Sequence, residues 1–207
     1  MAIIYAFVKI FEKEKYAEDF VAGKLYMNTI RYFQKYRDEA GEFRGDEYEG
    51  IAALYQPNKI SRISIDGIEI PSSELASPIV VHFDELLRKN AFCIYSLNNR
   101  GCETASADDF KRTVELHESC FGLGNFCVAI INAHEFIDRC QVAVRKNSFS
   151  GSLGLVDYYN EHELHGSLPS ERLGYQKRSF FGHQREYRLL IDTSNSRYSC
   201  QSTNDAG

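Results

Sequence analysis

The sequence predicts an α+β domain with a mixed, mostly antiparallel sheet and short flanking helices. Short runs of β-branched and aromatic residues alternate irregularly with stretches of helical spacing, so there is no regular βαβ repeat. Asp66-Gly67 stands between two apolar runs, as in a hairpin turn. Hydrophobic residues make up 43% of the 207 residues and charged residues 26%, which provides enough apolar surface for one core.

Apolar runs of strand length predict the strands. We expect strands at residues 3–10, 24–28, 51–56, 60–70 (as a hairpin), 80–81, 91–97, 126–131, 152–159 and 185–192. The runs 91–97 (AFCIYSL) and 126–131 (FCVAII) are almost wholly apolar and are expected to be buried.

Capping residues predict where the short helices begin. Thr29, Ser106 and Asn132 each precede a stretch of helical spacing, and their side chains can accept a hydrogen bond from the first helical turn. We expect helices over 12–22, 29–36, 84–90, 106–119 and 132–140.

Polar stretches predict the loops and the limits of the domain. Residues 37–50 are mostly charged and contain three glycines, so we expect an exposed loop, and residues 160–174 read as a second polar loop. Residues 194–207 are polar without periodicity. The prediction is therefore a single domain over 1–193 and a flexible tail over 194–207.

Charge, hydropathy and cysteine content narrow the class of protein. The net charge of −5 disfavours non-specific binding to nucleic acid. No apolar run reaches the roughly 18–20 residues of a membrane helix, and the apolar N-terminus lacks a basic start and a cleavage site. The six cysteines form no CxxC pair. We expect reduced thiols in a cytoplasmic protein without a membrane segment.

Common catalytic signatures are absent from the sequence. There is no GxxxxGK[ST] loop, no GxGxxG after a strand, no GxSxG and no HExxH. His162 and His165 are spaced to share a helix face and hold a metal, but no third ligand has diagnostic spacing. Solvated loop histidines are the favoured interpretation, so no metal is predicted.

Two charged stretches are candidates for a binding site. In the loop 37–50, Arg44 can bind an anionic group while Asp46 or Glu49 orients it, although a solvated acidic surface explains the loop equally well. Residues 172–188 are basic and could face phosphates, or could carry ordinary solvated charges.

Gln184 and Glu186 form a further candidate site, a QxE pair at a loop-to-strand boundary. Residues i and i+2 of a strand project to one side, so both side chains can meet one ligand. A carboxylate there can accept a hydrogen bond from a ribose hydroxyl. It can also stabilise the positive charge that develops on the sugar ring when a C–N glycosidic bond breaks. The alternative is that Glu186 only pairs with Lys177 or Arg188.

Three segments together resemble one group of bacterial and phage proteins. They are GKLYMNTIRYF with RGDEYEG, then AFCIYSL, then KRSFFGHQREYRLLI, and the resemblance spans most of residues 3–192. The group is similar to ADP-ribosyltransferase-like folds, and among these to messenger-RNA-modifying toxins of toxin–antitoxin–chaperone systems in phage defence.

The resemblance implies roles for particular residues. Glu186 would be catalytic and Gln184 would contact the acceptor. Ser96 would support the nicotinamide pocket of NAD, although Asn98 stands where the family pattern has a second hydroxyl. The first strand lacks the expected Arg or His and offers only Tyr5 and Lys9. The remaining residues expected in the NAD cleft are Arg44, Asp46, Asn28 and Tyr32.

Two functions are favoured at this point, and a nuclease or other hydrolase without a recognisable signature stays open beside them. One is an NAD-consuming ADP-ribosyltransferase that acts as a toxin or anti-phage effector on RNA or protein, with an antitoxin or chaperone as a possible partner. The other is a non-catalytic phage or mobile-element protein that sequesters a host factor.

Overall fold

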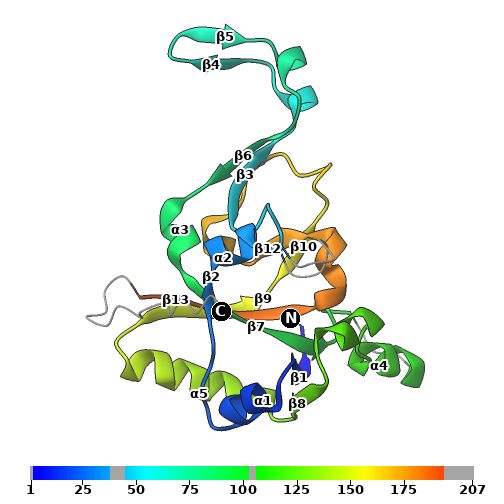
Figure 1. Cartoon of the computed structure of the whole chain (residues 1–207). Helices are drawn as coiled ribbons and strands as arrows, with labels where there is room; N and C mark the ends of the chain where they lie inside the picture. Colours follow the sequence, from blue (N-terminus) through cyan, green and yellow to red (C-terminus); the bar gives the residue numbers. More distant parts are fainter. Residues whose placement is uncertain (1, 38–44, 103–105, 194–207) are drawn as a thin grey trace.

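The structure is a computed structural model, and it describes residues 2–37, 45–102 and 106–193. Arg44 and the predicted tail 194–207 lie outside the described residues. Figure 1 shows a body built around one large sheet, with an arm that extends away from it.

The large sheet has six strands, and all of its pairs are antiparallel. Its order is β8-β1-β7-β13-β9, and the short β2 also pairs with β7. The strands are β1 (Ile4–Phe11), β2 (Asn28–Thr29), β7 (Asn90–Asn98), β8 (Phe126–Ile130), β9 (Ser150–Leu155) and β13 (Glu186–Asp192).

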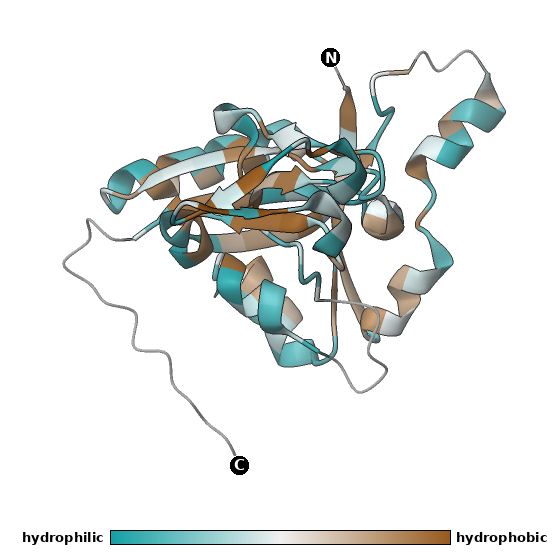
Figure 2. Cartoon of the chain, turned by 90° about the horizontal axis from the view of Figure 1, so that it is seen from above, coloured by the Kyte–Doolittle hydropathy of each residue, from teal (hydrophilic) through white to brown (hydrophobic). Residues whose placement is uncertain are grey.

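Two helices, α1 (Glu14–Val21) and α5 (Ala133–Lys146), cover one face of this sheet (Figure 1). Phe20 of α1 and Val144 of α5 belong to the same buried cluster as Phe7, Phe92 and Leu189 of the strands. In Figure 2 the strands of the sheet are largely hydrophobic, whereas the helices carry many hydrophilic residues. Burial of this apolar face is the main source of stability for the sheet. We call it the helix face.

The opposite face carries smaller elements, and we call it the charged face. A second buried cluster here joins Ile30, Leu87, Ala91, Tyr175 and Leu190. The covering helices are α2 (Ile30–Lys35) and α3 (Asp84–Arg88), and α4 (Ala107–Val114) lies beside β7.

Two small sheets complete the described strands of the body. A parallel pair forms from β10 (Asp157–Tyr159) and β12 (Gln176–Arg178). A three-stranded sheet forms from β11 (Gly166–Ser167), β3 (Ile51–Tyr55) and β6 (Ile79–His82). The 3-10 helices are η1 (Pro57–Lys59), η2 (Ser72–Glu74), η3 (Glu118–Leu123), η4 (Ser170–Arg172) and η5 (Ser179–Gln184).

The arm ends in a hairpin of β4 (Ile63–Ile65) and β5 (Ile68–Ile70), which turns at Asp66-Gly67 (Figure 1). Ile63 pairs with Ile70 and Ile65 pairs with Ile68, so four isoleucines share one face. Ile65 is 58% exposed and Ile68 is 68% exposed. The prediction of a hairpin at this turn is confirmed.

The three predicted caps are confirmed, but several element limits differ from the prediction. The side chains of Thr29, Ser106 and Asn132 each accept a backbone hydrogen bond at the start of α2, α4 and α5. The helix predicted from Ser106 to Ser119 ends at Val114, and the helix predicted to end near Cys140 continues to Lys146.

Two strand predictions also need correction, and two short strands, β11 and β12, were not predicted. Of residues 24–28 only Asn28 pairs with the sheet. The predicted strand 152–159 is broken at Val156, where the chain leaves β13 for β12. There the backbone N–H of Val156 still donates a hydrogen bond to the carbonyl of Glu186 in β13. The N–H of Asp157 donates instead to the carbonyl of Tyr175, which precedes β12. Mixed α/β architecture with mostly antiparallel pairs is confirmed.

Gly124 provides a test of close backbone packing before β8. It has a φ of 150°, and a Cβ there would lie 2.1 Å from the carbonyl oxygen of Phe11. Backbone cannot yield as a side chain can, so Gly124→Ala is expected to lower the free energy of unfolding by more than about 2 kcal/mol. Urea denaturation measures the change.

Gly23→Ala is the matched control, because Gly23 also has a positive φ of 87° but open space around its Cβ position. We expect it to lower stability by only about 1–2 kcal/mol. Equal effects of the two substitutions would contradict the close approach at Gly124.

Candidate functional site

Four buried charges form one ion network on the charged face of the sheet. They are Glu49, Lys177, Glu186 and Arg188, and their side chains are between 1% and 9% exposed. Two are acidic and two are basic, so the network is neutral. A buried charge is tolerated only when it is paired and hydrogen-bonded, so these four positions depend on one another.

Each oxygen of the Glu186 carboxylate accepts one hydrogen bond from a cationic side chain. Lys177 Nζ lies 2.6 Å from Oε1, and Arg188 Nη2 lies 2.8 Å from Oε2. Arg188 Nη1 lies 2.5 Å from Glu49 Oε1 and also donates to the carbonyl of Gly174 at 2.7 Å. Lys177 Nζ is 3.9 Å from Glu49 Oε2, which closes the ring of charges.

Local structure explains how distant residues reach this network. Glu186 and Arg188 are two apart in β13, so both point to the same face of the sheet. Lys177 comes from β12, and Glu49 from the turn that precedes β3. The turn ends at Gly50, whose φ of 71° and close approach to Ile30 suit glycine.

Gln184 and Glu186 are brought together, but not by the strand geometry that the sequence predicted. Gln184 ends η5, and Arg185 follows in the left-handed conformation at φ 41° and ψ 47°, before β13 begins at Glu186. Lys177 Nζ donates to Gln184 Oε1 at 2.6 Å and to Glu186 Oε1 at 2.6 Å. One ammonium group therefore links the carboxamide and the carboxylate.

The surrounding charges keep Glu186 ionised. Burial by itself would raise the pKa of Glu186, but Lys177 and Arg188 outweigh it and hold the pKa far below its ordinary value of 4.5. Burial, and next the charge of Glu186, raise the pKa of the nearby Cys93 thiol to about 12. Glu186 therefore presents a fixed negative charge, while Cys93 stays a protonated thiol and is no nucleophile.

Asp46 forms a separate buried ion pair rather than lying in an exposed loop. It is fully buried, and its Oδ1 accepts from Arg178 Nε at 2.7 Å. The prediction that residues 37–50 form an exposed loop is wrong for Asp46, Glu49 and Gly50, which are buried. The acidic side chains could be buried because cations more than 130 positions away pair with them.

Ser96 and Lys9 do not share a face with Glu186. Ser96 is opposite Phe7, on the helix face with Phe92 and Ile94, whereas Glu186 is opposite Tyr95. Ser96 is fully buried, and its Oγ accepts from Asn98 Nδ2 at 3.1 Å. Lys9 Nζ donates to the carbonyl of Cys93 at 2.6 Å. The structure therefore separates these two predicted NAD contacts from Glu186.

The other predicted NAD contacts are dispersed. Asn28 of β2 pairs with Ala91 of β7. Tyr32 on α2 is 45% exposed, and its ring contacts those of Phe33 and Tyr36. Tyr5 packs edge-on against Phe110 of α4. Asp46 pairs with Arg178 and not with a residue of the ion network, and Arg44 lies outside the described residues.

Four of the five Lys and Arg residues of the basic stretch 172–188 pair with carboxylates rather than carrying ordinary solvated charges. Lys177 and Arg188 are buried in the ion network, Arg178 pairs with Asp46, and Arg172 pairs with Asp157 at 2.7 Å. Burial lowers the pKa of His183, so this ring is neutral near pH 7.

The described residues contain no cluster of three or more side chains placed to hold a metal. His165 accepts the backbone N–H of Gln56 at 3.1 Å, and His162 is exposed. The five described cysteines form no disulfide. In the same described part of the chain, no helix combines the length and the apolar character needed to cross a bilayer.

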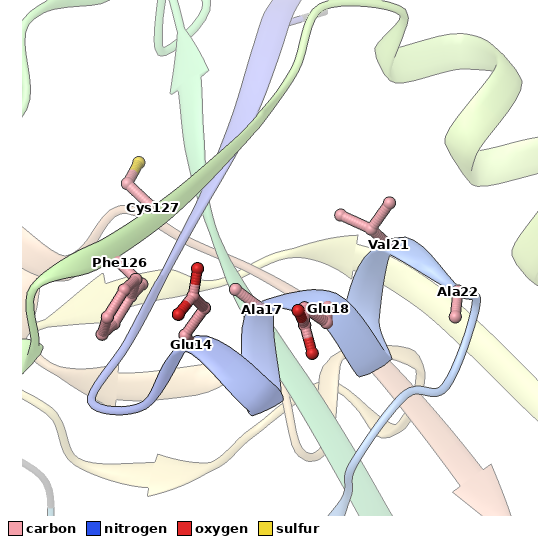
Figure 3. Close-up of a pocket in the computed structure, with 7 residues that line it drawn as sticks. All are labelled: Glu14, Ala17, Glu18, Val21, Ala22, Phe126 and Cys127. Carbon is pink, nitrogen blue, oxygen red and sulfur yellow. The ribbon is translucent and has the colours of Figure 1, made fainter.

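A separate hollow lies between α1 and β8 (Figure 3). Its lining is Glu14, Ala17, Glu18, Val21, Ala22, Phe126 and Cys127. The only charges on this lining are the two carboxylates, which repel an anionic dinucleotide. This hollow is therefore a poor site for NAD.

The sequence analysis named Lys177 and Arg188 as alternative partners of Glu186, and the structure shows Glu186 paired with both. It did not predict that these charges are buried, although the segment EYRLLI places two charges two positions apart in an otherwise apolar strand. A charge on the buried face of a strand requires a buried partner of opposite sign. Comparison with protein-family models, with curated proteins and with solved structures finds no match.

Removal of Glu49 should destabilise the protein strongly. Glu49→Ala leaves Arg188 with one acidic partner fewer in a buried site, so we expect a loss of about 3–5 kcal/mol in the free energy of unfolding. Glu47→Ala is the control, since Glu47 is 59% exposed and lies 3.7 Å from Arg178. Its expected loss is below about 1 kcal/mol. Chemical denaturation that finds similar losses would contradict the role of the network.

Stability should also fall in acid because of Glu186. Its pKa is lowered in the folded protein, so its contribution is fully present above the ordinary value of 4.5 and is lost as pH falls toward the folded pKa. Glu186→Gln should therefore show a smaller loss of stability than the wild type between about pH 6 and pH 3. Denaturation at each pH measures this, and parallel curves would contradict the expectation.

Proposed function

We propose that the protein is an NAD-dependent ADP-ribosyltransferase with an ADP-ribosyltransferase-like fold, and that Glu186 is its catalytic carboxylate. The observation that carries the proposal is the ionised Glu186 held beside Gln184 by Lys177. The resemblance of the QxE segment and of the AFCIYSL strand to that family supports it.

The reaction needs a fixed negative charge near the ribose. The bond between nicotinamide N1 and ribose C1′ breaks, and its electron pair neutralises the pyridinium ring. Positive charge then develops on the ribose, where a carboxylate stabilises it. A nucleophile of the acceptor bonds to C1′ and releases its proton to solvent.

Glu186 retains the capacity to bind a ribose hydroxyl. A carboxylate has roughly four lone-pair sites, and Lys177 and Arg188 use one on each oxygen. Since both cations hold the carboxylate in place, little reorganisation is needed when charge develops on the substrate.

The acceptor is proposed to be RNA or protein, and the role to be that of a toxin or anti-phage effector with an antitoxin or chaperone partner. The ion pairs of Arg172, Lys177, Arg178 and Arg188 weaken the argument that segment 172–188 binds RNA. Labelled NAD incubated with RNA, DNA or cell lysate separates these acceptors, and label on protein alone would reject a nucleic-acid target.

A second candidate function is a non-catalytic binding module. One observation favours it, namely that both Glu186 oxygens are already bonded while Ser96 lies on the other face of the sheet. Such a protein would neither bind NAD nor release nicotinamide from it.

Glu186→Gln tests the transferase. We expect nicotinamide release to fall about 100- to 1000-fold, the usual effect of removing a group that stabilises transition-state charge. Glu163→Gln is the matched control, because Glu163 is exposed on a loop. Circular dichroism establishes that both variants fold. Unchanged release in the Glu186 variant would remove Glu186 from the mechanism, and no release by the wild type would favour the binding module.

A further inference from the structure

Arg185 is a buried cation without an acidic partner. It is 8% exposed, and with Lys177 and Arg188 it makes up the buried cations of the described residues. The other two pair with carboxylates, whereas Arg185 forms no ion pair with any described residue. Its Nη2 donates to the carbonyl of Asn98, and its Nε has no hydrogen-bond partner. Its guanidinium carbon lies 5.8 Å from the centre of the Tyr95 ring, and a buried cation held only by neutral partners is a candidate site for an anion.

A second guanidinium group belongs to the same corner of the molecule. Exposed Arg100 follows β7, and its backbone N–H donates to Asn98 Oδ1 at 2.8 Å. Burial, and to a smaller extent repulsion by Arg100, lower the pKa of Arg185, while Tyr95 and Tyr158 oppose this. The backbone of Arg100 is therefore fixed to the side chain of Asn98, and its guanidinium is close enough to repel that of Arg185.

The backbone holds Arg185 in place. Its φ of 41° is uncommon for a residue other than glycine, and such strain persists where the surroundings fix the conformation. Asn98, which accepts from Arg185, is itself 4% exposed and bonded to Ser96. Ser96 thus supports the arginine through Asn98, from the helix face of the sheet.

We propose that Arg185 and Arg100 bind a phosphate group of a nucleotide. The planar fork of a guanidinium group matches phosphate oxygens, and two cations suit an anion that carries more than one charge. The identity of the nucleotide as NAD rests on the proposed function. Arg185 lies over the ring of Tyr95, the residue opposite Glu186 in the sheet, so one dinucleotide would place its phosphates at Arg185 and its ribose at Glu186.

Isothermal titration calorimetry with inorganic pyrophosphate and with ADP-ribose tests the proposal. Both ligands should bind the wild type, and affinity should fall about 10- to 100-fold in Arg185→Gln, the usual effect of losing a charged hydrogen bond. Arg100→Gln should weaken binding less, and this exposed position keeps the test valid should the Arg185 variant misfold. Arg62→Gln on the distant hairpin is the matched control and should bind like the wild type (Figure 1).

Three outcomes would overturn the phosphate site. They are no binding of either ligand to the wild type, equal binding by wild type and both arginine variants, and binding of pyrophosphate without ADP-ribose, which would reject a nucleotide. Arginine-dependent binding of both ligands by a wild type that releases no nicotinamide would keep the site and reject the transferase. Nicotinamide release that is unaffected in both arginine variants would keep the transferase and reject the site.

Discussion

The ion network of Glu49, Lys177, Glu186 and Arg188 is the constraint on which the rest of the structure depends. Four charges are stable in the interior only when the turn before β3, the short β12 and the strand β13 meet at one place. This requirement fixes how the small sheets lie on the charged face of the large sheet. It also fixes Glu186 as an ionised, immobile carboxylate, which is the property that the proposed chemistry uses.

Local signals in the sequence were sufficient for most of the elements. Thr29, Ser106 and Asn132 were predicted as caps because capping depends on a side chain and its own helix turn, and each forms the expected bond. The hairpin at Asp66-Gly67 followed from its turn residues in the same way. Limits that depend on distant contacts were predicted less well, as at Val156, where the strand leaves one sheet for another.

The site was only partly predictable because its pairing is long-range. Gln184 and Glu186 meet as expected, but through a left-handed residue and a shared lysine rather than through strand alternation. Ser96 was expected beside Glu186. In the sheet, however, Glu186 lies opposite Tyr95, so the side chain of Ser96, the next residue of that strand, points to the other face. Nothing local marks Glu49 as buried, since its partner Arg188 is 139 positions away.

The isoleucine face of the β4–β5 hairpin has a consequence for the behaviour of the protein in solution. Two short strands with four β-branched apolar side chains on one side form a surface prone to self-adhesion. Arg62 and Glu69 form an exposed ion pair beside these strands, and Asp66 stands at the turn. Charged residues that flank an aggregation-prone strand oppose its stacking against other copies. These three residues therefore protect the end of the arm from aggregation.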